Sequence, residues 1–302
     1  MPVHRQALSR WLQCLNEPQS NFKLMRLCTF FILLFSFNVA AQEIKPVYGD
    51  NSKAGAYAKV NGINMYYEIY GNGEPLLIIH GNGGSVFSAK DQIPFFQNKY
   101  KVIVVDSRGH GKTNNNIDSL SYDLIADDLN SLLEHLKIDS SYVFGQSDGA
   151  IVGLIMAFRY PKRVKKLAAM APNTRPDSAV TYPEVENWLK RNIALMTDSI
   201  KMGNQRAIKE MKYLRLMQYH PHISKEELSS IKAPVLVMSG DRDVIRLSHI
   251  IEIFRAIPKS QLAVLPGSTH FALSQNATVF NDMLYRFFSQ PFKMPNSLDY
   301  FK

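Results

Sequence analysis

The stretch Val143-Phe144-Gly145-Gln146-Ser147-Asp148-Gly149-Ala150 decides the fold of this chain. An apolar run ends at Ser147, and a glycine lies two residues before and two residues after this serine. A serine on a sharp turn between a strand and a helix brings these two positions into near contact, so neither can carry a large side chain. Gly145 and Gly149 meet this requirement. The stretch is therefore a candidate nucleophile elbow, which would expose the Ser147 hydroxyl at the end of a strand.

The flanking residues have the order that such an elbow needs. Residues 141–144 form a short apolar run that predicts a buried strand. After the serine, apolar residues recur at helical spacing until Tyr160-Pro161 ends the pattern: Ile151, Leu154, Ile155 and Phe158. The sequence therefore predicts strand, turn and helix in succession. The alternative is an ordinary loop in which Ser147 only caps the helix.

Further apolar runs predict the rest of a sheet. Residues 57–60 and 63–70 flank Asn61-Gly62, which is typical of a type I′ hairpin turn. Later runs alternate with helical patterns and predict parallel strands, at residues 76–79, 102–105, 166–171, 235–238 and 262–265. We expect an α/β protein with a mostly parallel, doubly wound sheet of about eight strands and an N-terminal antiparallel hairpin.

The alternation of strands and helices stops between residues 172 and 230. Two long helical patterns, roughly 183–202 and 204–219, follow each other there with no strand between them. We expect a helical lid over about 172–230, inserted into one domain that covers residues 42–302. With 46% hydrophobic residues, the chain can bury the large core that such a domain needs.

Residues 1–41 have the pattern of an N-terminal extension with a secretory signal peptide. Met25-Arg26 precedes an apolar run, and Val39-Ala40-Ala41 offers the small residues of a cleavage site. The apolar run is shorter than the about 20 residues that a membrane-spanning helix needs. We therefore expect cleavage after Ala41, a periplasmic or secreted protein, and no stable membrane anchor. Whether translation starts at Met1 or Met25 stays open.

Composition excludes several kinds of site and partner. Both cysteines, Cys14 and Cys28, precede the predicted cleavage point, so the exported chain would have no disulfide and no thiolate site. Removing residues 1–41 lowers the net charge from +9 to +6, and no basic run with interleaved aromatic residues predicts a nucleic-acid partner. His220 and His222 lack further metal-ligand types nearby. The sequence predicts no metal and no cofactor.

The chemically reactive residues each follow a predicted strand. They are His80, Asp106, Ser147, the pair Asp241 and Asp243, and His270. The carboxyl ends of parallel strands meet at one edge of a sheet, where ligands bind. A serine hydroxyl needs a base to take its proton, and the imidazolium so formed needs a carboxylate to orient it. Ser147, an aspartate and His270 therefore form a candidate catalytic set.

Five motifs carry a resemblance to a known family: HGNGG at 80–84, DSRGHG at 106–111, GQSDG at 145–149, GDRD at 240–243 and GSTH at 267–270. Over roughly residues 56–290 the chain resembles the α/β-hydrolase fold serine hydrolases, in their carboxylesterase, amino-acid ester hydrolase and prolyl aminopeptidase-like branch. The resemblance implies Ser147 as nucleophile and His270 as base. It implies Asp243 as the orienting acid, since this is usually the second carboxylate of the G-D-x-D turn.

The resemblance also implies an oxyanion hole built from two backbone N–H groups. One belongs to Asp148, the residue after the nucleophile, and the other to Asn82, with Gly83 as the alternative donor. His80 and His110 lie in motifs that the family uses to hold these loops, so we expect structural roles for both.

These residues predict a serine hydrolase that cleaves a small-molecule carboxylic ester through an acyl-enzyme. A second hypothesis concerns the side chain of Asp148, because some amino-acid ester hydrolases of this fold resemble the chain in having Ser-Asp-Gly at the elbow. Asp148 would then bind the α-ammonium of an amino-acid ester or of an aminopeptidase-like substrate, instead of only complementing the helix dipole. A third hypothesis is a lidded binding protein without turnover, although a binding protein has no need for the complete Ser, His and Asp set.

Overall fold

The computed structural model describes residues 47–113 and 120–301. The predicted signal peptide, its cleavage site and both cysteines lie outside these residues, so the expected export stays a prediction. No helix within the described ranges combines the length and the apolar character that crossing a membrane requires.

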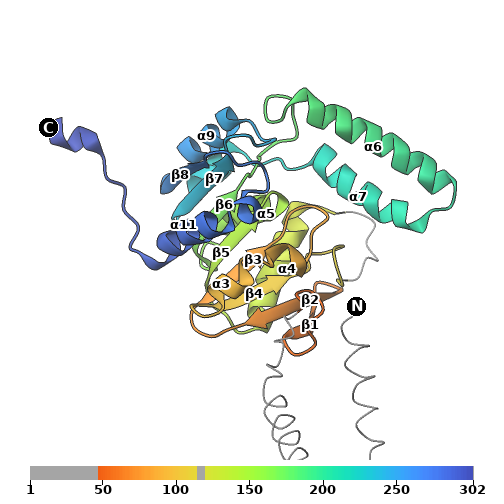
Figure 1. The fold of residues 1–302 in the computed structure, drawn as a ribbon, viewed down its shortest axis with the longest axis horizontal. Helices are drawn as coiled ribbons and strands as arrows, with labels where there is room; N and C mark the ends of the chain where they lie inside the picture. The colour runs from red at the N-terminus through yellow and green to blue at the C-terminus, as the bar shows by residue number, and fades with distance from the viewer. Residues whose placement is uncertain (1–46, 114–119, 302) are drawn as a thin grey trace, which may run out of the picture. The chain divides into compact units, whose positions relative to one another are not determined.

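The described residues form an eight-stranded, mostly parallel sheet, which confirms the predicted fold class (Figure 1). The strand order is β1-β2-β4-β3-β5-β6-β7-β8, in which β2 pairs antiparallel with β1 and β4 and the other pairs are parallel. The strands are β1 (Gly55–Val60), β2 (Ile63–Tyr70), β3 (Pro75–Ile79), β4 (Lys101–Val105), β5 (Ser141–Gln146), β6 (Val164–Met170), β7 (Val235–Gly240) and β8 (Ser260–Leu265).

The hairpin turn between β1 and β2 has the predicted backbone. Asn61 has a φ of 42° and Gly62 a φ of 79°, which are the positive values that a type I′ turn needs. The pairing runs from Val60 opposite Ile63 to Gly55 opposite Glu68. The first strand of the hairpin, β1, is therefore one edge strand of the sheet.

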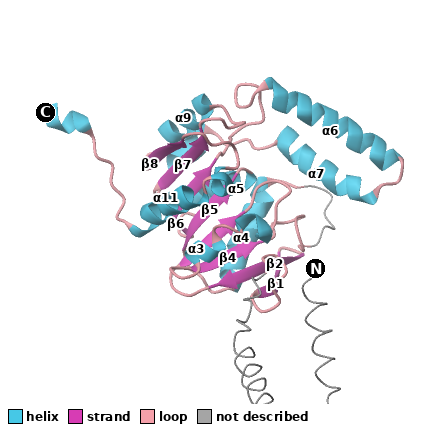
Figure 2. Ribbon diagram, viewed as in Figure 1, coloured by secondary structure: helices cyan, strands magenta, loops and turns pink. Residues whose placement is uncertain are grey.

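Helices cover both faces of the sheet (Figure 2). They are α3 (Ile93–Phe96), α4 (Tyr122–His135), α5 (Asp148–Arg159), α6 (Pro183–Lys201), α7 (Gln205–Tyr219), α8 (Lys225–Ser230), α9 (Leu247–Ala256), α10 (Ala272–Gln275) and α11 (Ala277–Ser289), with 3-10 turns at Val86–Ala89 and Ser297–Phe301. Successive side chains of a strand point to opposite faces. In β5, Val143 faces Gly153 of α5, whereas the Phe144 ring lies 5.4 Å from the Phe280 ring of α11. Helices α5 and α11 therefore pack on opposite faces.

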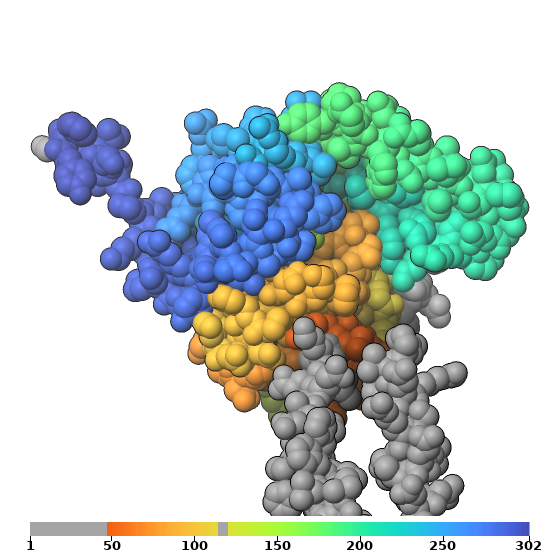
Figure 3. All heavy atoms as spheres, in the orientation of Figure 1, coloured from red at the N-terminus to blue at the C-terminus, as the bar shows by residue number. Residues whose placement is uncertain are grey.

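Helices α6 and α7 follow each other between β6 and β7, where the sequence predicted two helices with no strand between them. Their observed bounds differ from the predicted ones by a single residue at each changed end. Figure 3 shows the atoms of this pair, in green, as one layer that extends from the rest of the described residues. No residue of α6 is fully buried, whereas α7 buries Ala207, Tyr213, Leu214 and Leu216. Helix α7 is therefore the member of the pair that packs against the sheet part of the chain.

Candidate active site

Ser147 lies on a sharp turn between β5 and α5. Its φ of 55° and ψ of −119° place it in a region that residues other than glycine rarely adopt. A Cβ added to Gly145 would lie 2.1 Å from the carbonyl oxygen of Gly149, and one added to Gly149 would lie 2.2 Å from the carbonyl oxygen of Ile79. Both glycines are therefore required sterically: Gly145 by the predicted approach of residue 149, and Gly149 by the end of the neighbouring strand β3.

The side chains of Asp243 and His270 contact each other at the ends of β7 and β8. His270 Nδ1 lies 2.7 Å from Asp243 Oδ1, and the same oxygen accepts the backbone N–H of Ile245 at 3.0 Å. Because an ionised carboxylate can only accept, Nδ1 carries the proton in this pair. Nε2 is then the nitrogen that is left to accept a proton from another group.

The loop that carries His270 is attached to the elbow. Gln146, the residue before Ser147, donates from Nε2 to the backbone carbonyl of His270 at 3.2 Å. Within the described residues, Ser147 Oγ makes no hydrogen bond to the His270 ring. Hydrogen bonds between a nucleophile and its base commonly tighten only when substrate binds.

The loop after β3 runs directly beside the nucleophile. A Cβ added to Gly81 would lie 3.2 Å from the Cβ of Ser147 and 2.7 Å from Gln146 Oε1. In the described part of the chain, the backbone N–H groups of Asn82 and Asp148 donate to no other protein group. The predicted role of these two N–H groups as donors to a substrate oxygen stays a prediction.

The side chain of Asp148 is buried, with 8% of its surface exposed. Its carboxylate accepts a hydrogen bond from Asn82 Nδ2 at 2.8 Å and another from the Tyr122 hydroxyl. Burial raises the pKa of Asp148 to about 6, although both hydrogen bonds and the nearby His270 act in the opposite direction. Among the described residues, no Lys or Arg side chain forms an ion pair with it.

Comparison with known proteins gives a family and a set of related hydrolases. The family described as alpha/beta hydrolase fold matches residues 74–194. A 2-hydroxy-6-oxononadienedioate/2-hydroxy-6-oxononatrienedioate hydrolase of Comamonas testosteroni is 26% identical over 252 residues, which cover 72% of this chain and 88% of the relative.

The protein is a hydrolase of the α/β-hydrolase fold.

Two solved structures show the same fold. The enol-lactonase from Burkholderia xenovorans LB400 superimposes with a TM-score of 0.64 at 20% identity, covering 78% of this chain and 100% of its own. A thermophilic esterase from Thermogutta terrifontis superimposes with a TM-score of 0.63 at 22% identity, covering 78% and 97% of the two chains. At these identities the likeness concerns the fold alone.

The other polar residues of the motifs hold loops of this α/β-hydrolase together. His80 Nε2 accepts the backbone N–H of Ser107 at 3.1 Å, and its Nδ1 donates to the carbonyl of Gly81 at 2.7 Å. Arg108 forms a buried ion pair with Asp128, with Nε 2.5 Å from Oδ2. Asp241 accepts the backbone N–H of Ser268 at 3.1 Å. Across the described ranges, no three His, Cys, Asp or Glu side chains gather into a group that could hold a metal ion.

Several contacts of the site could not be found from the sequence. The Tyr122 hydroxyl on the Asp148 carboxylate, the amide of Gln146 on the His270 loop, and the side chain of Asn82 on Asp148 join segments far apart in the chain. Asn82 and Gln146 lie inside the motifs HGNGG and GQSDG, but no local pattern indicates which distant residue the side chain of each contacts.

The raised pKa of Asp148 predicts a pH-dependent stability. The folded α/β-hydrolase holds the proton of this carboxyl more tightly than the unfolded chain does, so the contribution of Asp148 is fully present below about pH 4 and lost as the pH rises through about 6. Asp148→Asn removes the buried charge but also part of the hydrogen bonding. At pH 8 we expect its free energy of unfolding to exceed that of the wild type by about 2 kcal/mol, and at pH 4 to be similar.

Urea unfolding of both proteins between pH 4 and pH 8 measures this difference. Asp241→Asn is the matched control, because the pKa of the exposed Asp241 carboxyl is lowered by backbone N–H groups. This variant should show no gain in stability at pH 8. A difference between Asp148→Asn and the wild type that does not change with pH would contradict the prediction.

Proposed function

We propose that the protein is a serine hydrolase that cleaves a carboxylic ester of a small molecule through an acyl-enzyme. The observation that carries the proposal is the contact of 2.7 Å between His270 and Asp243 at the same sheet edge as Ser147, which lies on a strained turn. An oriented imidazole beside an exposed serine can activate that serine as a nucleophile.

In the proposed reaction, His270 Nε2 takes the proton from Ser147 Oγ while the oxygen attacks the ester carbonyl. The negative charge that develops on the carbonyl oxygen is stabilised by the backbone N–H groups of Asn82 and Asp148. The tetrahedral intermediate then expels the alcohol, which receives the proton from His270. Water, activated by the same imidazole, attacks the acyl group on Ser147 and releases the carboxylic acid.

A second candidate function is the hydrolysis of amino-acid esters. It is favoured by the environment of Asp148, whose buried carboxylate has two neutral donors and, among the described residues, no basic partner from Lys or Arg. A buried carboxylate without a cation is costly. An α-ammonium next to the scissile carbonyl would supply the missing positive charge, and Asp148 directly follows the nucleophile in the sequence.

One panel of substrates tests both candidates. It contains p-nitrophenyl esters of increasing acyl length, each α-aminoacyl ester with its desamino analogue, a lactone and a carbamate. Hydrolysis of the plain esters with a burst of p-nitrophenol supports an acyl-enzyme. If Asp148 binds the ammonium, the amino substrate should be preferred in kcat/KM by about thirty-fold or more, and Asp148→Asn should abolish the preference.

The panel separates the outcomes clearly. If Asp148→Asn lowers kcat/KM equally for the amino substrate and its desamino analogue, the proposed function is that of a simple carboxylesterase. The preference should also fade below about pH 6, where Asp148 takes up its proton. Failure to hydrolyse any ester or lactone would contradict the first proposal.

A further inference from the structure

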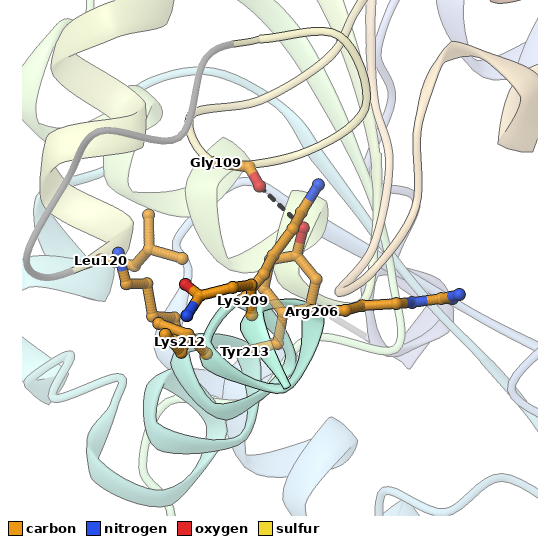
Figure 4. A pocket seen from close by; sticks show the side chains of 8 residues that line it. Gly109, Leu120, Arg206, Lys209, Lys212 and Tyr213 are labelled. Atoms are coloured by element: carbon orange, nitrogen blue, oxygen red, sulfur yellow. Dashed lines mark hydrogen bonds between the residues drawn. The ribbon is translucent and has the colours of Figure 1, made fainter. Parts of the chain in front are cut away.

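Helix α7 places one buried residue, Tyr213, against two loops beside the candidate active site. Figure 4 shows the contact with one of them, at Gly109. Its hydroxyl donates to the carbonyl oxygen of Gly109 at 2.7 Å. Both residues line a cavity of about 350 Å³ between the loop after β4 and helix α7. Its own backbone carbonyl accepts a hydrogen bond from Asn82 Nδ2 at 3.3 Å. The same residue therefore contacts the loop after β4 and the candidate oxyanion loop, residues 80–84.

The ring of Tyr213 begins a row of three neighbouring rings, of which the first two are stacked. It lies parallel to the buried His110 ring, with centroids 4.3 Å apart and an interplanar angle of 18°. Burial lowers the pKa of His110 to about 3, so this imidazole is neutral near pH 7. His110 in turn lies 5.0 Å from the His80 ring.

The last ring of this row, that of His80, belongs to the oxyanion loop itself. His80 accepts the backbone N–H of Ser107 with one nitrogen and donates to the Gly81 carbonyl with the other. Asn82 is the next residue, and its side chain is held by Asp148 on one side and by the Tyr213 carbonyl on the other. One chain of contacts from Tyr213 therefore ends on the peptide unit between Gly81 and Asn82, and another ends on the side chain of Asn82.

The position of these peptide units matters because an oxyanion donor acts over a narrow range of distances. The N–H must lie about 2.7 to 3.1 Å from the oxygen of the tetrahedral intermediate, and loss of one donor costs about 10² to 10³ in kcat. A small displacement of the loop would thus lower the rate without removing any catalytic group.

We propose that Tyr213 is a positioning residue, whose side chain holds the oxyanion loop through the Gly109 carbonyl and the row of rings from His110 to His80, and so couples helix α7 to transition-state stabilisation. The inference rests on the proposed function, because it assumes that an oxyanion forms beside Ser147. It adds to that function a residue outside the five motifs.

Two variants of the full-length protein test the proposal. Tyr213→Phe removes the hydroxyl and keeps the ring, and Tyr213→Leu also removes the ring stack. With p-nitrophenyl butyrate we expect kcat to fall about fivefold and about fiftyfold respectively, while KM changes less than twofold. Tyr219→Phe is the matched control, because it removes an exposed hydroxyl on the same helix, one that accepts a hydrogen bond from Arg215.

A second readout separates positioning from a general loss of structure. Phenylboronic acid forms a tetrahedral adduct that needs the oxyanion donors, whereas butyrate binds as the ground-state product. The inhibition constant for the boronic acid should rise in parallel with the loss of kcat, and that for butyrate should stay unchanged. If Tyr213→Leu unfolds, Tyr213→Phe still gives the boronic acid comparison.

The outcomes distinguish the two levels of the argument. Full kcat and full affinity for the boronic acid in both Tyr213 variants would overturn this inference and leave the proposed function intact. An equal loss of affinity for boronic acid and butyrate would also overturn it, because only structure would be affected. Hydrolysis that persists in Ser147→Ala would overturn the proposed function and the inference together.

Discussion

Ser147→Ala is expected to lower kcat for p-nitrophenyl butyrate by about 10⁵ to 10⁶, the range found when a serine nucleophile is removed from its catalytic set. The reason is geometric, since no other hydroxyl lies on the turn between β5 and α5. The same variant should no longer be labelled by a fluorophosphonate. Intact-mass analysis after incubation with the reagent measures this directly.

The control for Ser147→Ala is the stability of the variant. Alanine keeps the Cβ and removes only the hydroxyl, so the thermal unfolding midpoint should stay close to that of the wild type. Labelling of the alanine variant at the wild-type rate would show that another residue is the nucleophile.

Asp243→Asn should lower kcat by about 10⁴. An amide at this position can donate to His270 Nδ1 and so favours the tautomer in which Nε2 carries the proton and can no longer act as a base. Asp243 is buried and accepts from His270 at 2.7 Å, so no solvent group can replace its carboxylate. Initial rates and the pH profile of kcat/KM measure the loss.

Asp241→Asn serves as the matched control, since it lies two residues earlier in the same turn. Its carboxylate accepts the backbone N–H of Ser268 and makes no contact with His270, so we expect a loss of less than about tenfold. If Asp241→Asn were the more damaging change, the orienting acid would be Asp241.

The strands and the elbow could be predicted because their causes are local. A strand buried on both faces must be apolar at successive positions, and the predicted runs lie within β3, β4, β5 and β7, each within two residues of the observed bounds. The predicted run at 262–265 lies within β8, although this edge strand exposes Leu262 and Val264. The requirement for glycine at 145 follows from sterics across five residues, whereas that at 149 comes from contact with Ile79 of β3. The roles of Ser147, His270 and Asp243 stay predictions, although the structure places Asp243 and His270 in contact.

The long-range contacts of the site have no local cause in the sequence, whereas helix α9 has one. The contacts of Asn82 with Asp148 and Tyr213 span 66 and 131 residues, and no periodicity reports such a pairing. Helix α9 was not predicted, although Ile250, Ile253 and Ile257 recur at helical spacing and are buried. This helix begins at Leu247, four residues after Asp243.

The backbone of Ser147 also bears on how the protein can evolve. A positive φ at a residue with a Cβ stores about 1 to 3 kcal/mol, and glycine at this position would release most of it. The most stable descendants of this chain are therefore inactive ones. Selection for heat resistance alone would favour such inactive variants. Directed evolution of the protein therefore has to screen for turnover in every round.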